Sequence, residues 1–136
     1  MTLREQLIRD EGVVLKPYFD SVGKLTIGVG RNLDDVGISR HEAEYLLDQD
    51  ILRASEALLA HLPWINDIDS VRRAVLINMA FNMGIGGLLQ FKKTLTAIKL
   101  SDWHGAARHM LDSKWAAQVG PRATRLAKQM RTGVWQ

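Results

Sequence analysis

Residues 11–30 read Glu11-Gly-Val-Val-Leu-Lys-Pro-Tyr-Phe-Asp20-Ser-Val-Gly-Lys-Leu-Thr26-Ile-Gly-Val-Gly30. This stretch has no helical period, because a proline and several glycines interrupt it, and its aromatic and β-branched residues favour strands. The segment 20–24 is typical of a hairpin turn, since Gly23 can adopt a positive φ angle. The sequence therefore predicts a small hairpin that carries two carboxylates and a threonine hydroxyl.

Helical patterns surround this hairpin on both sides. Thr2-Leu-Arg-Glu5 and Ser39-Arg-His-Glu42 are capping boxes, which predict a short helix over residues 3–10 and a long one over about 39–62. From Asp69 to about Gly84 a helical pattern is apolar around most of its circumference, which is typical of a buried helix. Three further helices are predicted over about 88–99, over 101–112 with Ser101 as its cap, and from Pro121 to Gly133.

These patterns predict an α+β fold that is mainly helical. We expect a single domain over residues 1–136, with a small sheet lobe at about 12–38 and a helical lobe at about 63–136 that packs with helix 3–10. The long helix at about 39–62 would join the two lobes.

Composition excludes several classes of site. The chain has no cysteine, which excludes disulfides, thiol nucleophiles and thiolate metal sites. No apolar run approaches the roughly 20 residues of a membrane span. The formal net charge is +3, yet residues 113–136 hold five basic and no acidic side chains. That basic end is either a solvated helix face or a surface attracted to nucleic acid, a membrane or the bacterial wall.

Glu11 and Asp20 are a candidate acid pair. Glycoside hydrolysis uses one carboxylic acid to protonate the leaving oxygen and a second carboxylate to stabilise the cationic sugar or to activate water. Thr26 follows on the predicted hairpin and adds a hydrogen-bonding hydroxyl. The simpler alternative is that Glu11 ends a helix and Asp20 caps a turn, and spacing alone leaves both readings open.

The pattern Glu11-x8-Asp20-x5-Thr26-Ile-Gly-Val-Gly30 resembles the active-site signature of the T-even phage type of lysozyme, glycoside hydrolase family 24. The resemblance covers nearly the whole chain. Three further segments are similar to that family's interlobe helix, its buried hub helix and its C-terminal pattern, namely 38–50, 69–84 and 131–135.

The resemblance implies a role for each matching residue. Glu11 would be the general acid, and Asp20 would stabilise an oxocarbenium-like transition state. Asp20 and Thr26 would hold the attacking water, so that the anomeric carbon inverts and the two carboxyl groups stand roughly 6.5–9.5 Å apart. Arg122 would approach and support Glu11. The family's substrate contacts correspond to Asn32, Phe81, Thr94 and His109.

The chain also departs from the family pattern. Arg31 stands where the best-known members have histidine, so an acid-sensitive ion pair there would lose its titrating partner. Asn82 replaces a longer glutamine at the cleft. The stretch between Gly30 and the interlobe helix is about two dozen residues shorter than in those members, and a small helix of the first lobe is expected to be missing.

The implied function is that of an endolysin-type N-acetylmuramidase. It would hydrolyse the β-1,4 bond between N-acetylmuramic acid and N-acetylglucosamine in bacterial peptidoglycan, with no metal or organic cofactor. We expect a monomer that neither binds nucleic acid nor inserts stably into a membrane. Without a signal peptide it would stay in the host cytoplasm until another protein opens the membrane.

Two rival hypotheses belong to other classes. One is a catalytically silent peptidoglycan-binding module of the same fold. The other is a protein that acts on membranes or nucleic acid through its basic C-terminal helix.

Overall fold

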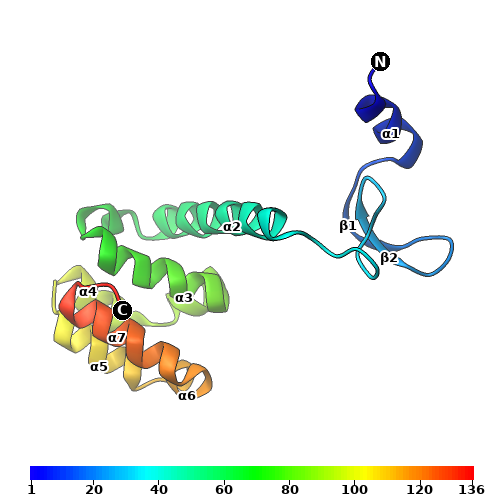
Figure 1. Ribbon diagram of the computed structural model, residues 1–136. Coiled ribbons are helices and arrows are strands. Elements are labelled where there is room, and N and C mark those ends of the chain that lie inside the picture. The colour runs from blue at the N-terminus through cyan, green and yellow to red at the C-terminus, as the bar shows by residue number, and fades with distance from the viewer. The chain divides into compact units, whose positions relative to one another are not determined.

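The computed structural model describes residues 1–136, and its chain divides into two compact units, Met1–Leu46 and Leu47–Gln136 (Figure 1). The boundary lies inside helix α2 (Arg40–His61). One three-stranded antiparallel sheet lies in the first unit, and helices make up most of the rest of the chain. The predicted α+β class with dominant helices is confirmed.

The first unit begins with helix α1 (Leu3–Glu11). Its capping box forms in both directions: the Glu5 amide donates to Thr2 Oγ1 over 3.1 Å, and the Thr2 amide donates to Glu5 Oε2 over 2.8 Å. Gly12 ends the helix with φ of 77°. Glu11 is therefore the last helical residue, one position beyond the predicted end.

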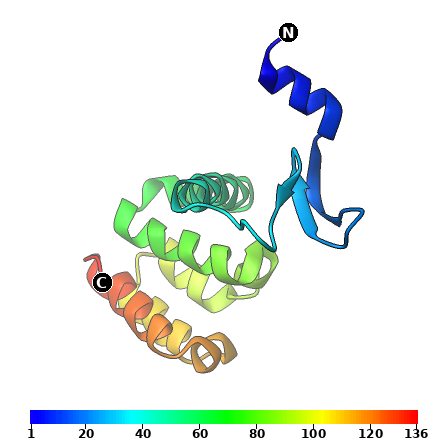
Figure 2. The ribbon, with the colours of Figure 1, turned by 45° about the vertical axis from the view of Figure 1, so that its right-hand side comes forward.

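A small sheet follows α1 (Figure 2). Strand β1 (Val14–Phe19) pairs with β2 (Leu25–Gly28), and β2 pairs with β3 (Arg31–Asn32). The predicted hairpin is confirmed, including a φ of 83° at Gly23 in its turn. The sequence did not predict β3, which is only two residues long.

The connection from β3 to α2 contains no helix, as the resemblance implied. The chain turns over residues 33–37, where the Gly37 amide donates to the Leu33 carbonyl over 3.1 Å. Ser39 and Glu42 then exchange the two bonds of the second predicted capping box, over 3.1 and 2.9 Å. Helix α2 therefore starts where the sequence places it.

The second unit is helical throughout. After the last part of α2 its elements are η1 (Pro63–Asp67), α3 (Ser70–Leu89), α4 (Lys92–Lys99), α5 (Trp103–Leu111), α6 (Lys114–Val119) and α7 (Pro121–Thr132). Helix α7 packs against α5 and α3 (Figure 1). The predicted buried hub is confirmed, because α3 buries five residues: Val75, Leu76, Met79, Ala80 and Leu88.

Some predicted helix bounds were wrong. The chain resumes a helix after Gly84, which has φ of 80°, and that helix ends at Leu89, so no single helix covers 88–99. Asp102, not Ser101, caps α5 by accepting from the Gly105 amide over 3.0 Å. Helix α6 was not predicted; its cap is Ser113.

By the test of length and apolar composition, no helix of the chain spans a membrane on its own. Helices α3 and α4 pass that test only when taken together, and they meet at a bend of 103°.

Arg72 ties the start of α3 to the end of α7. Its guanidinium donates to the carbonyls of Met130 over 2.6 Å and Arg131 over 3.1 Å. It also lies 4.2 Å from the centre of the Trp103 ring and pairs with Asp69, the cap of α3. Lysine or arginine at a helix C-terminus satisfies carbonyls that lack a partner in the helix.

We expect Arg72→Met to lower the free energy of unfolding of the second unit by about 2–3 kcal/mol, since it removes charged hydrogen bonds and a cation–π contact. Chemical denaturation followed by circular dichroism measures the change. Arg125→Met is the matched control, because Arg125 is exposed on α7, and it should shift stability by less than about 0.5 kcal/mol. Equal losses in the two variants would contradict this role of Arg72.

Candidate active site

The Glu11 carboxyl lies against the backbone of Gly30. A Cβ on Gly30 would stand 3.2 Å from Glu11 Oε2, and Gly30 has φ of 70°. A side chain at position 30 would therefore strain the backbone and press on the carboxyl. Glu11 is exposed, and no hydrogen bond or ion pair within the chain engages its carboxyl. The proposed acid is thus free to meet a ligand.

Asp20 follows β1 directly and holds the hairpin turn. Its Oδ1 accepts from the amides of Val22 over 3.0 Å and Lys24 over 2.8 Å. Asp20 therefore does cap the turn, as the simpler alternative predicted. Both bonds use Oδ1, however, so Oδ2 remains available to another group.

Thr26 on β2 is the only fully buried residue of the first unit, with 3% of its surface exposed. Its Oγ1 donates to the Lys24 carbonyl over 2.9 Å. The Asp20 amide donates to the same carbonyl, also over 2.9 Å. The Lys24 carbonyl therefore joins Asp20 and Thr26, the two residues predicted to hold water.

Asn32 lies beside Thr26 on the neighbouring strand, because the two residues are paired across β2 and β3. Its amide is engaged with Asp35: Nδ2 donates to Asp35 Oδ2 over 3.0 Å, and Oδ1 accepts from the Asp35 amide over 2.9 Å. The structure thus places Asn32 next to Thr26, with its side chain bonded to Asp35 of the 33–37 turn.

The two aspartates of that turn, Asp34 and Asp35, bind residues of the hairpin. Asp34 Oδ2 accepts from the Leu25 amide over 2.8 Å, and Asp35 pairs with Lys24 Nζ over 3.2 Å. Nowhere in the chain do three or more potential metal ligands among His, Asp and Glu gather into one group.

Arg31 forms an ion pair with Glu42 at the start of α2. One guanidinium nitrogen lies 2.8 Å from Glu42 Oε2, and another donates to Glu42 Oε1 over 2.8 Å and to the Gly37 carbonyl over 3.1 Å. The hydrogen bond from Arg31, helped by the Ser39 amide, lowers the pKa of Glu42 to about 2. Glu42 in turn raises the pKa of Arg31.

In the second unit, Thr94 and His109 line one pocket of about 440 Å³. Thr94 is 2% exposed, and Phe91 and Trp115 meet edge-on in the same wall with ring centres 6.0 Å apart. Three lysines against one aspartate make the rim basic: Lys92, Lys93, Lys114 and Asp112. Two of the predicted substrate contacts are therefore neighbours.

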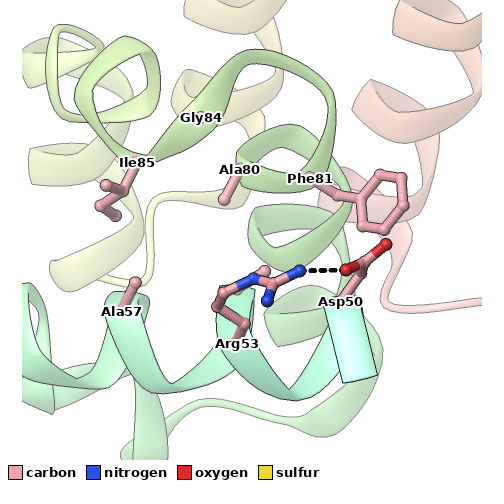
Figure 3. Close-up of a pocket in the computed structure, with 8 residues that line it drawn as sticks. Asp50, Arg53, Ala57, Ala80, Phe81, Gly84 and Ile85 are labelled. Carbon is pink, nitrogen blue, oxygen red and sulfur yellow. Dashed lines mark hydrogen bonds and ion pairs between the residues drawn. The ribbon is translucent and has the colours of Figure 1, made fainter. Parts of the chain in front are cut away.

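Phe81 lies between two other pockets of the second unit and is 46% exposed. One, of about 490 Å³, has small residues on its walls and the Asp50–Arg53 ion pair beside the Phe81 ring (Figure 3). The other, of about 450 Å³, includes Arg122. Phe81 and Arg122 therefore share a pocket that Thr94 does not line.

Two asparagines on α3 accept hydrogen bonds from α6 and α7, and one of the donors is the predicted site residue Arg122. Arg122 donates through two nitrogens to Asn78 Oδ1, over 3.0 and 2.8 Å. Asn82 Oδ1 accepts from Trp115 Nε1 over 2.8 Å. Sequence reasoning missed Asn78, although an amide within a mainly apolar helical pattern was a usable signal.

Residues 9–131 match the family model described as phage lysozyme. The chain belongs to the phage lysozyme family. Membership supports a lysozyme-like function, that of a glycoside hydrolase acting on peptidoglycan.

Relatives agree with this assignment. The pre-baseplate central spike protein Gp5 of Enterobacteria phage T4 is 31% identical over 161 aligned positions, which cover 98% of this chain and 28% of the spike protein. Two Dictyostelium discoideum proteins, named "Probable T4-type lysozyme 1" and "Probable T4-type lysozyme 2", are 29% and 30% identical. The alignments cover 97% of this chain and 95% of each Dictyostelium protein.

The matched region is shorter in this chain than in the spike protein. The alignment with the spike protein has 161 positions and this chain has 136 residues, so at least 25 positions of the relative have no counterpart here. That number agrees with the predicted shortening of about two dozen residues between Gly30 and α2, where the structure has only a short strand and a turn.

Replacing Arg31 by histidine should make stability depend on pH near neutrality. In the wild type the pKa of Glu42 is lowered in the folded state, so the stabilisation by the pair is complete above about pH 4.5 and is lost only as the pH falls towards 2. In Arg31→His the imidazole pKa would be raised by Glu42, so its stabilisation is present below about pH 6.5 and is lost as the pH rises.

Unfolding free energies measured between pH 5 and 9 test this difference. Arg31→Lys is the control, because lysine stays charged over that range, and its profile should be parallel to the wild type. An Arg31→His profile as flat as that of Arg31→Lys would show that the pair does not stabilise the fold.

Proposed function

We propose that the chain is an endolysin-type muramidase that cleaves the β-1,4 bond between N-acetylmuramic acid and N-acetylglucosamine with inversion. One observation carries the proposal: the Lys24 carbonyl holds Asp20 and Thr26 together, while Asp20 Oδ2 and the Thr26 oxygen lone pairs remain unused. The unengaged carboxyl of Glu11 belongs to the same unit. An inverting glycosidase uses one carboxylic acid as proton donor and a second carboxylate to activate water, and Glu11 and Asp20 could supply these groups.

Glu11 acts first in the proposed mechanism. Its carboxylic acid gives a proton to the glycosidic oxygen, the bond from that oxygen to the anomeric carbon breaks, and positive charge develops on the sugar ring. The Asp20 carboxylate stabilises this charge. Arg122, which Asn78 orients within the second unit, is proposed to support Glu11.

Water completes the reaction on the opposite face of the sugar. A backbone carbonyl can only accept, so the Thr26 hydroxyl donates its one O–H hydrogen bond to the Lys24 carbonyl and can only accept a hydrogen bond from the water. The water oxygen attacks the anomeric carbon, and a water proton passes to the free Oδ2 of Asp20. The product sugar carries the inverted hydroxyl, and the acid and the base exchange protons with solvent.

The helical unit is proposed to contact the substrate through Phe81, Thr94 and His109, and the sheet unit through Asn32. Thr94 and His109 share a pocket whose rim carries three lysines, and peptidoglycan peptides carry carboxylates that a basic rim attracts. An exposed aromatic ring such as Phe81 offers an apolar surface to a sugar or peptide.

Glu11→Gln should abolish lysis of a purified peptidoglycan suspension. Glutamine keeps the size of the side chain but cannot donate the proton, and general acid catalysis supplies about 10²–10⁴-fold in rate. Clearing is measured as the fall in turbidity with time. Asp10→Asn, one residue away and on the exposed end of the same helix, is the control and should clear at the wild-type rate.

Other results would favour the rival functions. If neither the wild type nor Glu11→Gln clears the suspension but both sediment with it, the chain is a wall-binding module. If Glu11→Gln changes nothing and a peptide of residues 119–136 retains the main activity, the basic helix acts by itself.

The stereochemistry of the product tests the water-holding role of Thr26. Proton NMR during the first minutes of hydrolysis should show the α anomer of the new reducing sugar, because water attacks the face opposite the leaving group. A β anomer formed first would require a covalent intermediate and would contradict this role.

A further inference from the structure

The ladder between β2 and β3 is irregular at its end. Leu33 lies opposite Leu25 and donates its amide to the Leu25 carbonyl over 2.7 Å. In a regular antiparallel ladder the two residues would also form a second hydrogen bond, from the Leu25 amide to the Leu33 carbonyl. Here the Leu33 carbonyl accepts from Gly37 instead, over 3.1 Å, because the short connection to α2 turns immediately.

Asp34 supplies the missing acceptor. Its Oδ2 accepts from the Leu25 amide over 2.8 Å, so a side-chain oxygen replaces the backbone carbonyl that the turn has withdrawn. A hydrogen bond to an ionised acceptor is stronger than one to a neutral carbonyl. Asp34 therefore extends the sheet by one bond beyond the two residues of β3.

The Leu25 amide belongs to the same planar peptide group as the Lys24 carbonyl. Asp34 binds its N–H, while its oxygen accepts from the Asp20 amide and from Thr26 Oγ1, both over 2.9 Å. Because a peptide group is rigid, holding the N–H also fixes the direction of the carbonyl oxygen. A carboxylate on the N–H also polarises the group and makes the oxygen a better acceptor.

We propose that Asp34 is a positioning residue for the hydrolytic water, acting through the Lys24–Leu25 peptide group. The inference rests on the proposed function, since it assigns Asp34 to the water that Asp20 and Thr26 hold. With the peptide group fixed, the Thr26 hydroxyl keeps donating to the Lys24 carbonyl and the Thr26 lone pairs face the water. Without Asp34 the peptide group is restrained only on its carbonyl side and tilts more easily, and the hydroxyl can then donate to water instead.

Asp34 is well placed for such a role to be tested cleanly. It is exposed, and its one side-chain hydrogen bond is the bond to Leu25. Its removal therefore opens no cavity and leaves in place the bonds that Asp20 Oδ1 accepts from the Val22 and Lys24 amides. A change in catalysis can be separated from a loss of the fold.

The test compares Asp34→Ala with Asp34→Asn in the full chain, using soluble, uncross-linked glycan strands. Alanine removes the acceptor, whereas asparagine keeps a carbonyl oxygen at the same place. We expect Asp34→Ala to lower kcat about tenfold with KM unchanged. A tenfold change in rate corresponds to the free energy of about one hydrogen bond. Asp34→Asn should recover kcat to within about twofold of the wild type.

A control and a second measurement accompany the kinetics. Asp48→Ala removes the same charge from an exposed site on α2 and should leave kcat and KM at wild-type values. Amide hydrogen exchange should show Leu25 protected in the wild type and in Asp34→Asn but exchanging about tenfold faster in Asp34→Ala, because its amide loses its acceptor.

Three kinetic results would overturn the proposal: a kcat of Asp34→Ala equal to that of the wild type, a loss confined to KM, or the same loss of kcat in Asp34→Asn. A wild type that cleaves nothing would refute the proposed function instead. Exchange at Leu25 would then test only the structural step, since equal exchange in the wild type and Asp34→Ala would show that the bond does not fix the peptide group.

Discussion

The peptide group between Lys24 and Leu25 is the constraint on which the sheet unit depends. Its oxygen accepts from Asp20 and Thr26, and its N–H is bound by Asp34. Thr26 is the only buried residue in this unit, so hydrogen bonds rather than an apolar core hold the candidate catalytic groups. The helical unit differs, because a contiguous apolar core holds its helices together.

Much of the fold was predictable because its signals are local. Both capping boxes form with the predicted partners, and the hairpin turn contains the expected positive φ angle at Gly23. The apolar circumference of 69–84 identified the buried hub. In each case the residues that determine the conformation lie within a few positions of one another, so sequence spacing alone carries the information.

Other features depend on contacts that spacing does not reveal. The use of Asp34 follows from the turn taking the Leu33 carbonyl away from the ladder, and the bond from Arg122 to Asn78 spans 44 residues. Similarly, Asp102 rather than Ser101 caps α5, because local propensity allows either residue and the packed chain selects one. The sequence predicted which residues gather on the sheet, while their bonding partners required the structure.

The bonds that organise Asp20, Thr26 and Asp34 all lie within residues 20–37. Contacts of such short sequence separation form quickly, with little loop-closure entropy to overcome. The hairpin can therefore assemble early on the growing chain, before the helical core is complete. Such independence also makes the segment tolerant of evolutionary change elsewhere, so a lineage could shorten or lengthen its surroundings by tens of residues and keep the same hairpin.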